Sequence, residues 1–186
     1  MVEQVATGTV VSARELATMS GESVPIPDPQ RLIHLQFRRF AGCPICNTHL
    51  QSIARRHEDI TAAGIREVVV FHSTAQELAR YTADLPFAVI GDPDKVLYAE
   101  FGVEASPRAV LDPRGMVPVI RSLPAMLRKR TAPPARPHGG HSGLPADFLI
   151  GRDGRVLAAK RGIHAYDQWS VDELLAHAAL APRSTS

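Results

Sequence analysis

The sequence predicts an α/β fold with a mixed central sheet, and three observations support this. Short apolar runs that suit buried strands alternate with segments of helical periodicity over residues 31–102. An Asp153-Gly154 hairpin turn joins two further strands near the carboxyl end. A capping box at residues 170–173 begins a last helix. Strand–helix alternation followed by a hairpin is typical of parallel strands extended by an antiparallel pair.

The first elements follow from local patterns. Residues 31–37 form a short, mostly apolar run, which predicts a buried strand. From Pro44 onward apolar residues recur at helical spacing, and Gly64 is a natural left-handed stop for this helix. Residues 66–73 then predict a second buried strand.

The middle of the chain continues the alternation and then breaks it. Residues 73–84 predict a helix capped by Ser73 or Thr74, residues 85–92 a third strand, and residues 92–102 a short helix with Pro93 in its first turn. The proline-rich and basic segment 103–143 reads as an insertion, with one helix near residues 116–129. We expect a single domain over 1–186, with residues 1–30 as an N-terminal extension.

Composition excludes several classes of protein. The 186 residues are 45% hydrophobic and 22% charged, with a formal net charge of +2, which gives little reason to expect a nucleic-acid partner. No apolar run approaches the roughly 18–20 residues of a membrane span. The amino terminus shows no secretory signal pattern, so a cytoplasmic location is the default expectation. Two cysteines also exclude a disulfide scaffold.

The two cysteines lie three residues apart in the stretch FRRFAGCPICNTHL, where a strand is followed by a helix. Unpaired N–H groups at a helix start favour a thiolate, and they can lower a cysteine pKa from about 8.5 to roughly 3.5–7.5. Side chains three apart on one turn are close enough for a disulfide after a small relaxation. Cys43 and Cys46 are therefore predicted to switch between dithiol and disulfide, with Pro44 stiffening the ring.

Other interpretations of the pair remain open. Cys43 and Cys46 could supply half of a zinc site that His138 and His141 complete, although zinc pairs usually lie on knuckle turns rather than before a long helix. They could also be two small buried side chains. His49 and His57, on the following helix, read as surface or helix-face residues rather than catalytic bases.

Several blocks resemble known proteins. FRRFAGCPICNTHL and LPADFLIGRDGRVLAAKRG together resemble the thioredoxin fold, and FAVIGDPDKVLYAEFG is similar to a stretch of peroxiredoxins of the alkyl hydroperoxide reductase and thiol-specific antioxidant family. The resemblance, best to the peroxiredoxin-like branch with a C-x-x-C, covers roughly residues 30–102 and 144–180. It implies a thioredoxin fold with an insertion before the C-terminal hairpin. It also implies a thiol oxidoreductase that reduces peroxides or protein disulfides.

The resemblance implies further site features. A cis-proline that faces the cysteines corresponds to Pro145, with Pro107 as its rival, so we expect a cis Leu144–Pro145 bond. In the peroxiredoxin register Cys46 takes the peroxidatic position. The family's catalytic arginine has no counterpart near Pro145, so Arg38, Arg39 or Arg108 would have to substitute for it. This departure weakens the peroxidase reading but leaves dithiol chemistry intact.

The attacking sulfur is not settled by sequence. Cys43 precedes the helix proper, and on that physical ground it should have the lower pKa, with Cys46 more covered. The peroxiredoxin register argues the reverse. We therefore expect Cys43 to attack disulfide substrates and Cys46 to attack peroxide.

No cofactor is expected, and the expected partners are a peroxide or disulfide substrate and an external thiol reductant, either thioredoxin-like or a low-molecular-weight thiol. A homodimer is a further expectation, and neither nucleic acid nor membrane is expected as a partner. Two alternative activities remain: a disulfide reductase without peroxidase activity, and a redox-sensing or zinc-binding interaction module that uses residues 103–143.

Overall fold

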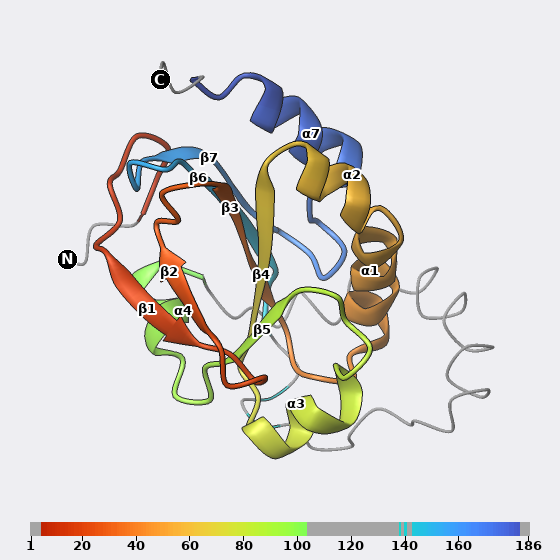
Figure 1. The fold of residues 1–186 in the computed structure, drawn as a ribbon. Coiled ribbons are helices and arrows are strands. Elements are labelled where there is room, and N and C mark those ends of the chain that lie inside the picture. Colours follow the sequence, from red (N-terminus) through yellow and green to blue (C-terminus); the bar gives the residue numbers. More distant parts are fainter. Residues whose placement is uncertain (1–4, 104–137, 139, 141–142, 183–186) are drawn as a thin grey trace.

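The structure is a computed structural model that describes residues 5–103, 138, 140 and 143–182 (Figure 1). A five-stranded sheet in the order β5-β4-β3-β6-β7 forms its centre. β3 (Leu32–Arg38), β4 (Ile65–Phe71) and β5 (Ala88–Gly91) are parallel, and β6 (Ala146–Ile150) and β7 (Val156–Arg161) are antiparallel to their neighbours. The predicted mixed sheet is therefore confirmed.

The two faces of the sheet carry different elements (Figure 1). α1 (Pro44–Arg55), α2 (His57–Ala62) and α7 (Val171–Ala179) lie on one side, which we call the helix face. The hairpin of β1 (Arg14–Ala17) and β2 (Ser23–Ile26) lies on the other side together with α4 (Val96–Glu100), and we call this the hairpin face. α3 (Ala75–Tyr81) follows β4 near the end of the sheet at which β3 enters α1.

Local signals explain where the helices begin and end. Thr74 and Ser170 both accept from a glutamate N–H three residues on, and each glutamate side chain accepts from the cap N–H in return. These two capping boxes satisfy backbone donors that would otherwise lack partners at α3 and α7. Gly64 adopts a φ of +74° after α2, as the sequence predicts for a helix stop.

Some element boundaries differ from the prediction. The expected single helix after Pro44 breaks at Arg56, whose φ of −113° and ψ of 22° leave the helical region, so α1 and α2 are separate. Pro93 precedes α4 rather than opening it, because Lys95 is the cap, in the left-handed region at φ 57°. The helix expected near residues 116–129 lies outside the described residues, as does most of the insertion predicted at 103–143.

The predicted N-terminal extension contributes to the sheet. Beside β7, the N–H groups of Gly8 and Val11 donate to the carbonyls of Val156 and Gly154, at 2.8 and 2.9 Å. Beyond β1, the Met19 N–H donates to the Val89 carbonyl of β5 at 2.8 Å. The segment 8–19 thus bonds to the backbone of both outer strands of the sheet.

A large apolar core lies on the hairpin face. Alternate residues of β3 point into it, namely Ile33, Leu35 and Phe37. They pack with Val68, Val70 and Phe148 of the neighbouring strands and with residues of β2 and α4. On the helix face the apolar residues form smaller clusters, among them one beneath α2 and α7 and one near α3. This division leaves room on the helix face for polar groups.

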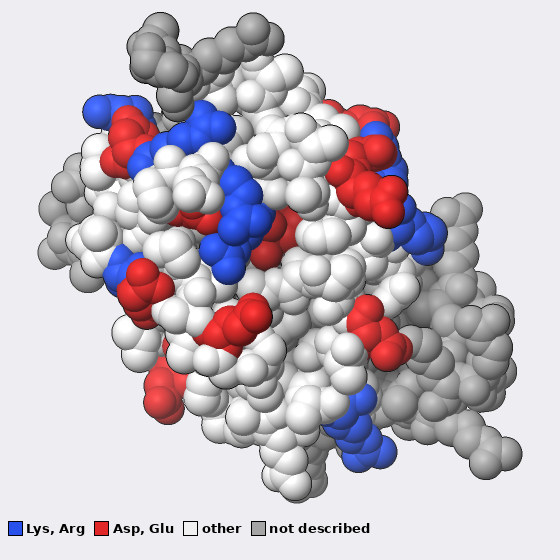
Figure 2. Space-filling view, viewed as in Figure 1, with Lys and Arg blue, Asp and Glu red and all other residues white. Residues whose placement is uncertain are grey.

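The exposed charges are mixed in sign. Figure 2 shows acidic and basic side chains next to one another on the face drawn. Of the described helices, none has the length and apolarity needed to cross a membrane.

Candidate active site

The cysteine pair lies where β3 passes into α1, as the sequence predicts. Cys43 is the cap residue of α1, with extended backbone at φ −61° and ψ 119°, and Pro44 is the first helical residue. Gly42 before it has a φ of +82°, and a Cβ there would lie 2.8 Å from Tyr81 Cε1. A glycine is therefore needed at the turn into the motif, because both the backbone angle and the tyrosine ring exclude a side chain.

Both thiols are buried and reduced. Cys43 and Cys46 are each 1% exposed, and they pack in a small cluster with Phe40, Ile45 and Ala165. A small molecule reaches such a recessed sulfur more easily than a folded protein does.

The two sulfurs have different protonation tendencies. A hydrogen bond from the Cys43 thiol is the largest influence that lowers the pKa of Cys46, to about 7, and the Arg39 cation and its backbone N–H act in the same direction against the effect of burial. Burial and the bond to Cys46 raise the pKa of Cys43 well above its ordinary value. When one of the two sulfurs ionises, the arrangement therefore favours a Cys46 thiolate that accepts from a protonated Cys43.

This finding corrects the argument from helix position. Cys43 was expected to have the lower pKa and Cys46 to be more covered, but the pKa order is reversed and the two are equally buried. The physical reason is that burial and the hydrogen bond that its thiol donates to Cys46 raise the pKa of Cys43, although Cys43 receives the Cys46 N–H. Cys46 instead receives both the Cys43 thiol and the Arg39 N–H, which lower its pKa. The pKa order instead agrees with the peroxiredoxin register.

The candidate arginines are placed differently. The Arg39 Nη1 lies 3.9 Å from Cys43 Sγ, and its side chain is almost fully buried. Arg38 points to the helix face and is fully buried among polar partners. Arg108 lies outside the described residues. Arg39 is therefore the arginine that the structure brings against the cysteine pair.

Pro145 precedes β6 directly, and its carbonyl accepts from the Gly162 N–H at 2.8 Å. Ile26–Pro27 is the one cis peptide bond among the described residues, so Leu144–Pro145 is trans and the predicted cis bond is wrong. The trans form is the default, favoured by about 0.5–1 kcal/mol in X–Pro bonds. Pro107, the rival residue, lies outside the described part of the chain.

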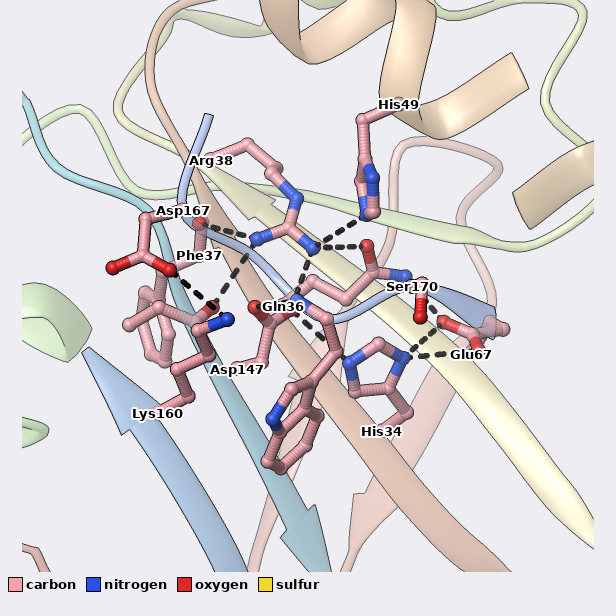
Figure 3. Close-up of polar contacts among 12 residues, drawn as sticks. His34, Gln36, Phe37, Arg38, His49, Glu67, Asp147, Lys160, Asp167 and Ser170 are labelled. Carbon is pink, nitrogen blue, oxygen red and sulfur yellow. Dashed lines mark hydrogen bonds and ion pairs between the residues drawn. The ribbon is translucent and has the colours of Figure 1, made fainter. Parts of the chain in front are cut away.

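A ladder of buried polar side chains runs along the helix face of β3 (Figure 3). We call it the polar ladder, and it consists of His34, Gln36, Arg38, His49, Glu67 and Asp147. His34 Nδ1 lies 2.9 Å from Glu67 Oε2, and His34 Nε2 lies 3.2 Å from Asp147 Oδ1. Asp147 Oδ1 also accepts from Arg38 Nη2 at 2.6 Å. The ladder thus connects β4, β3 and β6.

The charges in the ladder balance one another. Burial disfavours a charged His34, yet the carboxylates of Glu67 and Asp147 outweigh it and raise the His34 pKa to about 9. The Asp147 pKa is held well below its usual range by Arg38 and His34, although burial opposes this. Two cations therefore face two carboxylates, which is the condition under which buried charges are tolerated.

His49 belongs to this ladder rather than to the surface, which corrects part of the sequence interpretation. It is 6% exposed, and burial together with the Arg38 cation lowers its pKa to about 3, so its neutral Nε2 can accept from Arg38 Nη2 at 3.3 Å. His57 is half-buried, with its ring centroid 5.9 Å from that of Phe87.

Sequence reasoning missed His34, Glu67 and Asp147. Their signal was the alternation of polar residues in RLIHLQFRR, which places His34, Gln36 and Arg38 on one side of the strand. The zinc interpretation gains no support, since no group of three or more potential ligands gathers among the described residues. His138 instead places Nε2 3.1 Å from the Pro93 carbonyl, and His141 lies outside the described residues.

Comparison with solved structures supports the fold. A peroxidoxin, BcpB, from Mycobacterium tuberculosis has a TM-score of 0.69 at 15% identity, over 96% of this chain and 100% of that one. A cysteine-to-serine mutant of Xylella fastidiosa PrxQ has a TM-score of 0.67 at 14% identity, covering 94% and 95%. A putative thiol:disulfide interchange protein, DsbE, from Chlorobium tepidum reaches 0.58 at 19% identity, covering 94% and 99%. The predicted thioredoxin fold is thereby confirmed.

Comparison of the sequence with family models identifies the family of the chain. No curated protein matches the sequence significantly. A family model described as AhpC/TSA antioxidant enzyme matches residues 52–164, which is more than half of the 186 residues. The match begins after Cys46, so the cysteine pair is evidence separate from it. The chain belongs to the AhpC/TSA antioxidant enzyme family, and it is a peroxiredoxin-like thiol oxidoreductase.

Proposed function

We propose that the protein reduces peroxides, with Cys46 as the attacking sulfur and Cys43 as the resolving one. The observation that carries the proposal is the unequal pair: the pKa of Cys46 is lowered to about 7, whereas that of Cys43 is raised. One sulfur is thus poised as a nucleophile near neutral pH, and its neighbour retains the proton. Burial of both sulfurs favours a small substrate over a protein disulfide.

The proposed cycle has three steps. The Cys46 thiolate attacks one peroxide oxygen, the O–O bond breaks, and the leaving alkoxide or hydroxide takes up a proton, which gives a sulfenic acid on Cys46. The Cys43 sulfur then attacks the Cys46 sulfur, a disulfide forms and water leaves. An external dithiol reduces this disulfide by thiol–disulfide exchange and returns both cysteines to the starting state.

Arg39 is the residue that we propose in place of the family's catalytic arginine. Its Nη1 lies 3.9 Å from Cys43 Sγ, and its cation favours ionisation of both sulfurs. A guanidinium there can also donate to the peroxide oxygens as negative charge develops on the leaving group. We retain Pro145 as a proposed site residue, because it directly precedes β6 in a segment that resembles the proline loop of thioredoxins.

The location, the reductant and the oligomeric state are further parts of the proposal. We propose a cytoplasmic protein whose reductant is either thioredoxin-like or a low-molecular-weight thiol. The homodimer stays a prediction, which sedimentation velocity on the reduced protein checks. The single domain over 1–186 is likewise a prediction, and one cooperative unfolding transition is its expected signature.

The decisive experiment measures hydrogen peroxide consumption with a recycling dithiol, beside reduction of insulin disulfides, for the wild type and each Cys→Ser variant. We expect peroxide turnover in the wild type and none in Cys46→Ser. Cys43→Ser should form the Cys46 sulfenic acid once and then stop. Insulin reduction without peroxide turnover would instead identify a disulfide reductase. A sulfenic acid that forms on Cys43 in Cys46→Ser would overturn the assignment of roles.

A further inference from the structure

Burial of the charged side chains of the polar ladder costs desolvation free energy, and the proposed cycle does not use these side chains directly. His34, Gln36, Arg38 and Asp147 are 0% exposed, and the side chains of His34, Glu67, Arg38 and Asp147 form ion pairs out of contact with water. Buried ion pairs are often replaceable by apolar side chains without loss of stability, so stability alone does not explain this one. A role in positioning a charge does.

The ladder ends beside the helix that carries Cys46. Arg38 Nη2 lies 3.3 Å from His49 Nε2, and His49 is three residues after Cys46 on α1. Side chains three apart on a helix are neighbours on its surface, so the guanidinium lies within about one helical turn of Cys46. The next residue, Arg39, follows the end of β3, and its Nη1 lies 3.9 Å from Cys43 Sγ.

Asp147 holds Arg38 in this place. Its Oδ1 accepts from Arg38 Nη2 at 2.6 Å, and its Oδ2 accepts from the Trp169 N–H at 3.1 Å. Arg38 Nη1 also lies 3.1 and 3.3 Å from the carbonyls of Phe37 and Ala146. The Arg38 guanidinium is thus held by two backbone carbonyls and by the Asp147 carboxylate, which is itself bonded to the loop before α7. These contacts fix the position of the guanidinium (Figure 3).

We propose that the buried Arg38–Asp147 pair is a positioning device that holds a cation where it favours a thiolate on Cys46 over one on Cys43, in addition to the hydrogen bond from the Cys43 thiol. The proposal rests on the proposed dithiol cycle, which needs one ionised and one protonated sulfur. Arg39 cannot make the choice, because its cation favours ionisation of both cysteines. Arg38 instead reaches His49, one turn after Cys46 on α1, and in support its cation lowers the pKa of that cysteine.

The test measures which of the two cysteines is ionised, through its reaction with an alkylating agent. The reduced protein is treated with limiting iodoacetamide across a pH range, and fragment masses show which cysteine is alkylated. Wild type should react at Cys46 with an apparent pKa of about 7. Arg38→Met should raise that pKa by about half a unit, since a nearby cation favours the thiolate and Arg38 is the weakest of the influences named for Cys46. The ratio of Cys46 to Cys43 alkylation at neutral pH should fall about two-fold. Arg38→Lys retains the cation and should recover part of the preference.

Two further variants separate this role from folding. The double variant Arg38→Met/Asp147→Leu replaces the pair by apolar side chains, so it should fold even where the single variant does not. Its Cys46 pKa should be higher than that of the wild type, as in Arg38→Met. Glu67→Gln is the matched control, because it lies in the same ladder at the His34 end and is equally buried. It should lower the unfolding midpoint but leave the Cys46 pKa in place.

The outcomes are distinct from those of the peroxide assay. A Cys46 preference that survives intact in the double variant would overturn the proposal, as would a Glu67→Gln shift as large as that of Arg38→Met. Alkylation involves no peroxide, so a protein without peroxidase activity would still report which sulfur is ionised. Loss of the proposed function and loss of this inference can therefore be told apart.

Discussion

The two sides of β3 carry side chains of different kinds. Toward the hairpin face, Ile33, Leu35 and Phe37 enter a continuous apolar core. Toward the helix face, the alternating polar side chains of His34, Gln36 and Arg38 are fully buried. His34 and Arg38 form ion pairs there, out of contact with water. One strand thus provides stability on one side and fixed charge on the other. The comparison teaches that a fully buried strand need not be apolar, provided that every charge finds a partner.

The largest expected effect concerns the apolar side. Phe37 has its ring 5.0 Å from that of Tyr98 and 5.2 Å from that of Phe101. Phe37→Ala should lower the free energy of unfolding by about 3–5 kcal/mol, because a large cavity replaces the ring. Urea denaturation measures this. The remaining folded protein should still alkylate at Cys46, and Phe37→Leu is the milder control. A shifted Cys46 preference in Phe37→Leu would show that the two sides of β3 are not independent.

A smaller effect, on the polar side, depends on pH. The His34 pKa is raised from 6.5 to about 9, so its protonated form stabilises the fold below pH 6.5. That contribution, on the order of a few kcal/mol, should decline as pH rises from 6.5 through about 9. Denaturant unfolding at a series of pH values measures the decline.

The pH experiment needs two controls. Cys46 titrates in the same window and the pKa of Cys43 also changes on folding, so both cysteines should first be replaced by serine in every sample. His34→Gln should then flatten the pH dependence, because the titrating group is gone. A serine variant whose stability stays constant between pH 6.5 and 9 would contradict a charged His34.

The smallest expected effect compares a buried ion pair with an exposed one. Arg56 Nη1 lies 2.5 Å from Asp172 Oδ1, a bond between the start of α2 and the start of α7, but the two side chains are 40% and 83% exposed. Arg56→Met should leave the free energy of unfolding almost unchanged, since water screens such pairs. Thermal unfolding in low and high salt checks this. A loss comparable to that of Phe37→Ala would contradict the distinction drawn between exposed and buried pairs.

Much of the fold could be predicted because its signals are local. The capping box at Ser170, the Asp153-Gly154 turn and the stop at Gly64 each depend on a few adjacent residues. The break at Arg56 and the start of α4 were missed, because no strong local breaker marks the first and Pro93 suggests an earlier start for the second. Boundaries of this kind depend on packing more than on propensity.

The candidate site was predictable only in part. Cys43 and Cys46 are marked by spacing and by their place between strand and helix. Their relative pKa values depend on a hydrogen bond between the two sulfurs and on the burial of Cys43, so the simple argument from helix position chose the wrong sulfur. Asp147 is 109 positions from Arg38, and only the fold brings them together.

The N-terminal segment has a consequence for how the protein behaves in a crowded solution. Outer strands of a sheet offer unpaired N–H and C=O groups to which a strand of another molecule can bond. Gly8 and Val11 occupy part of that position beside β7, and Met19 occupies one beside β5. Without residues 1–30, both borders of the sheet would be open to other chains. The extension therefore covers part of each border, and it also supplies Val24 and Ile26 to the apolar core, so we expect a truncated chain to aggregate more readily than the full one.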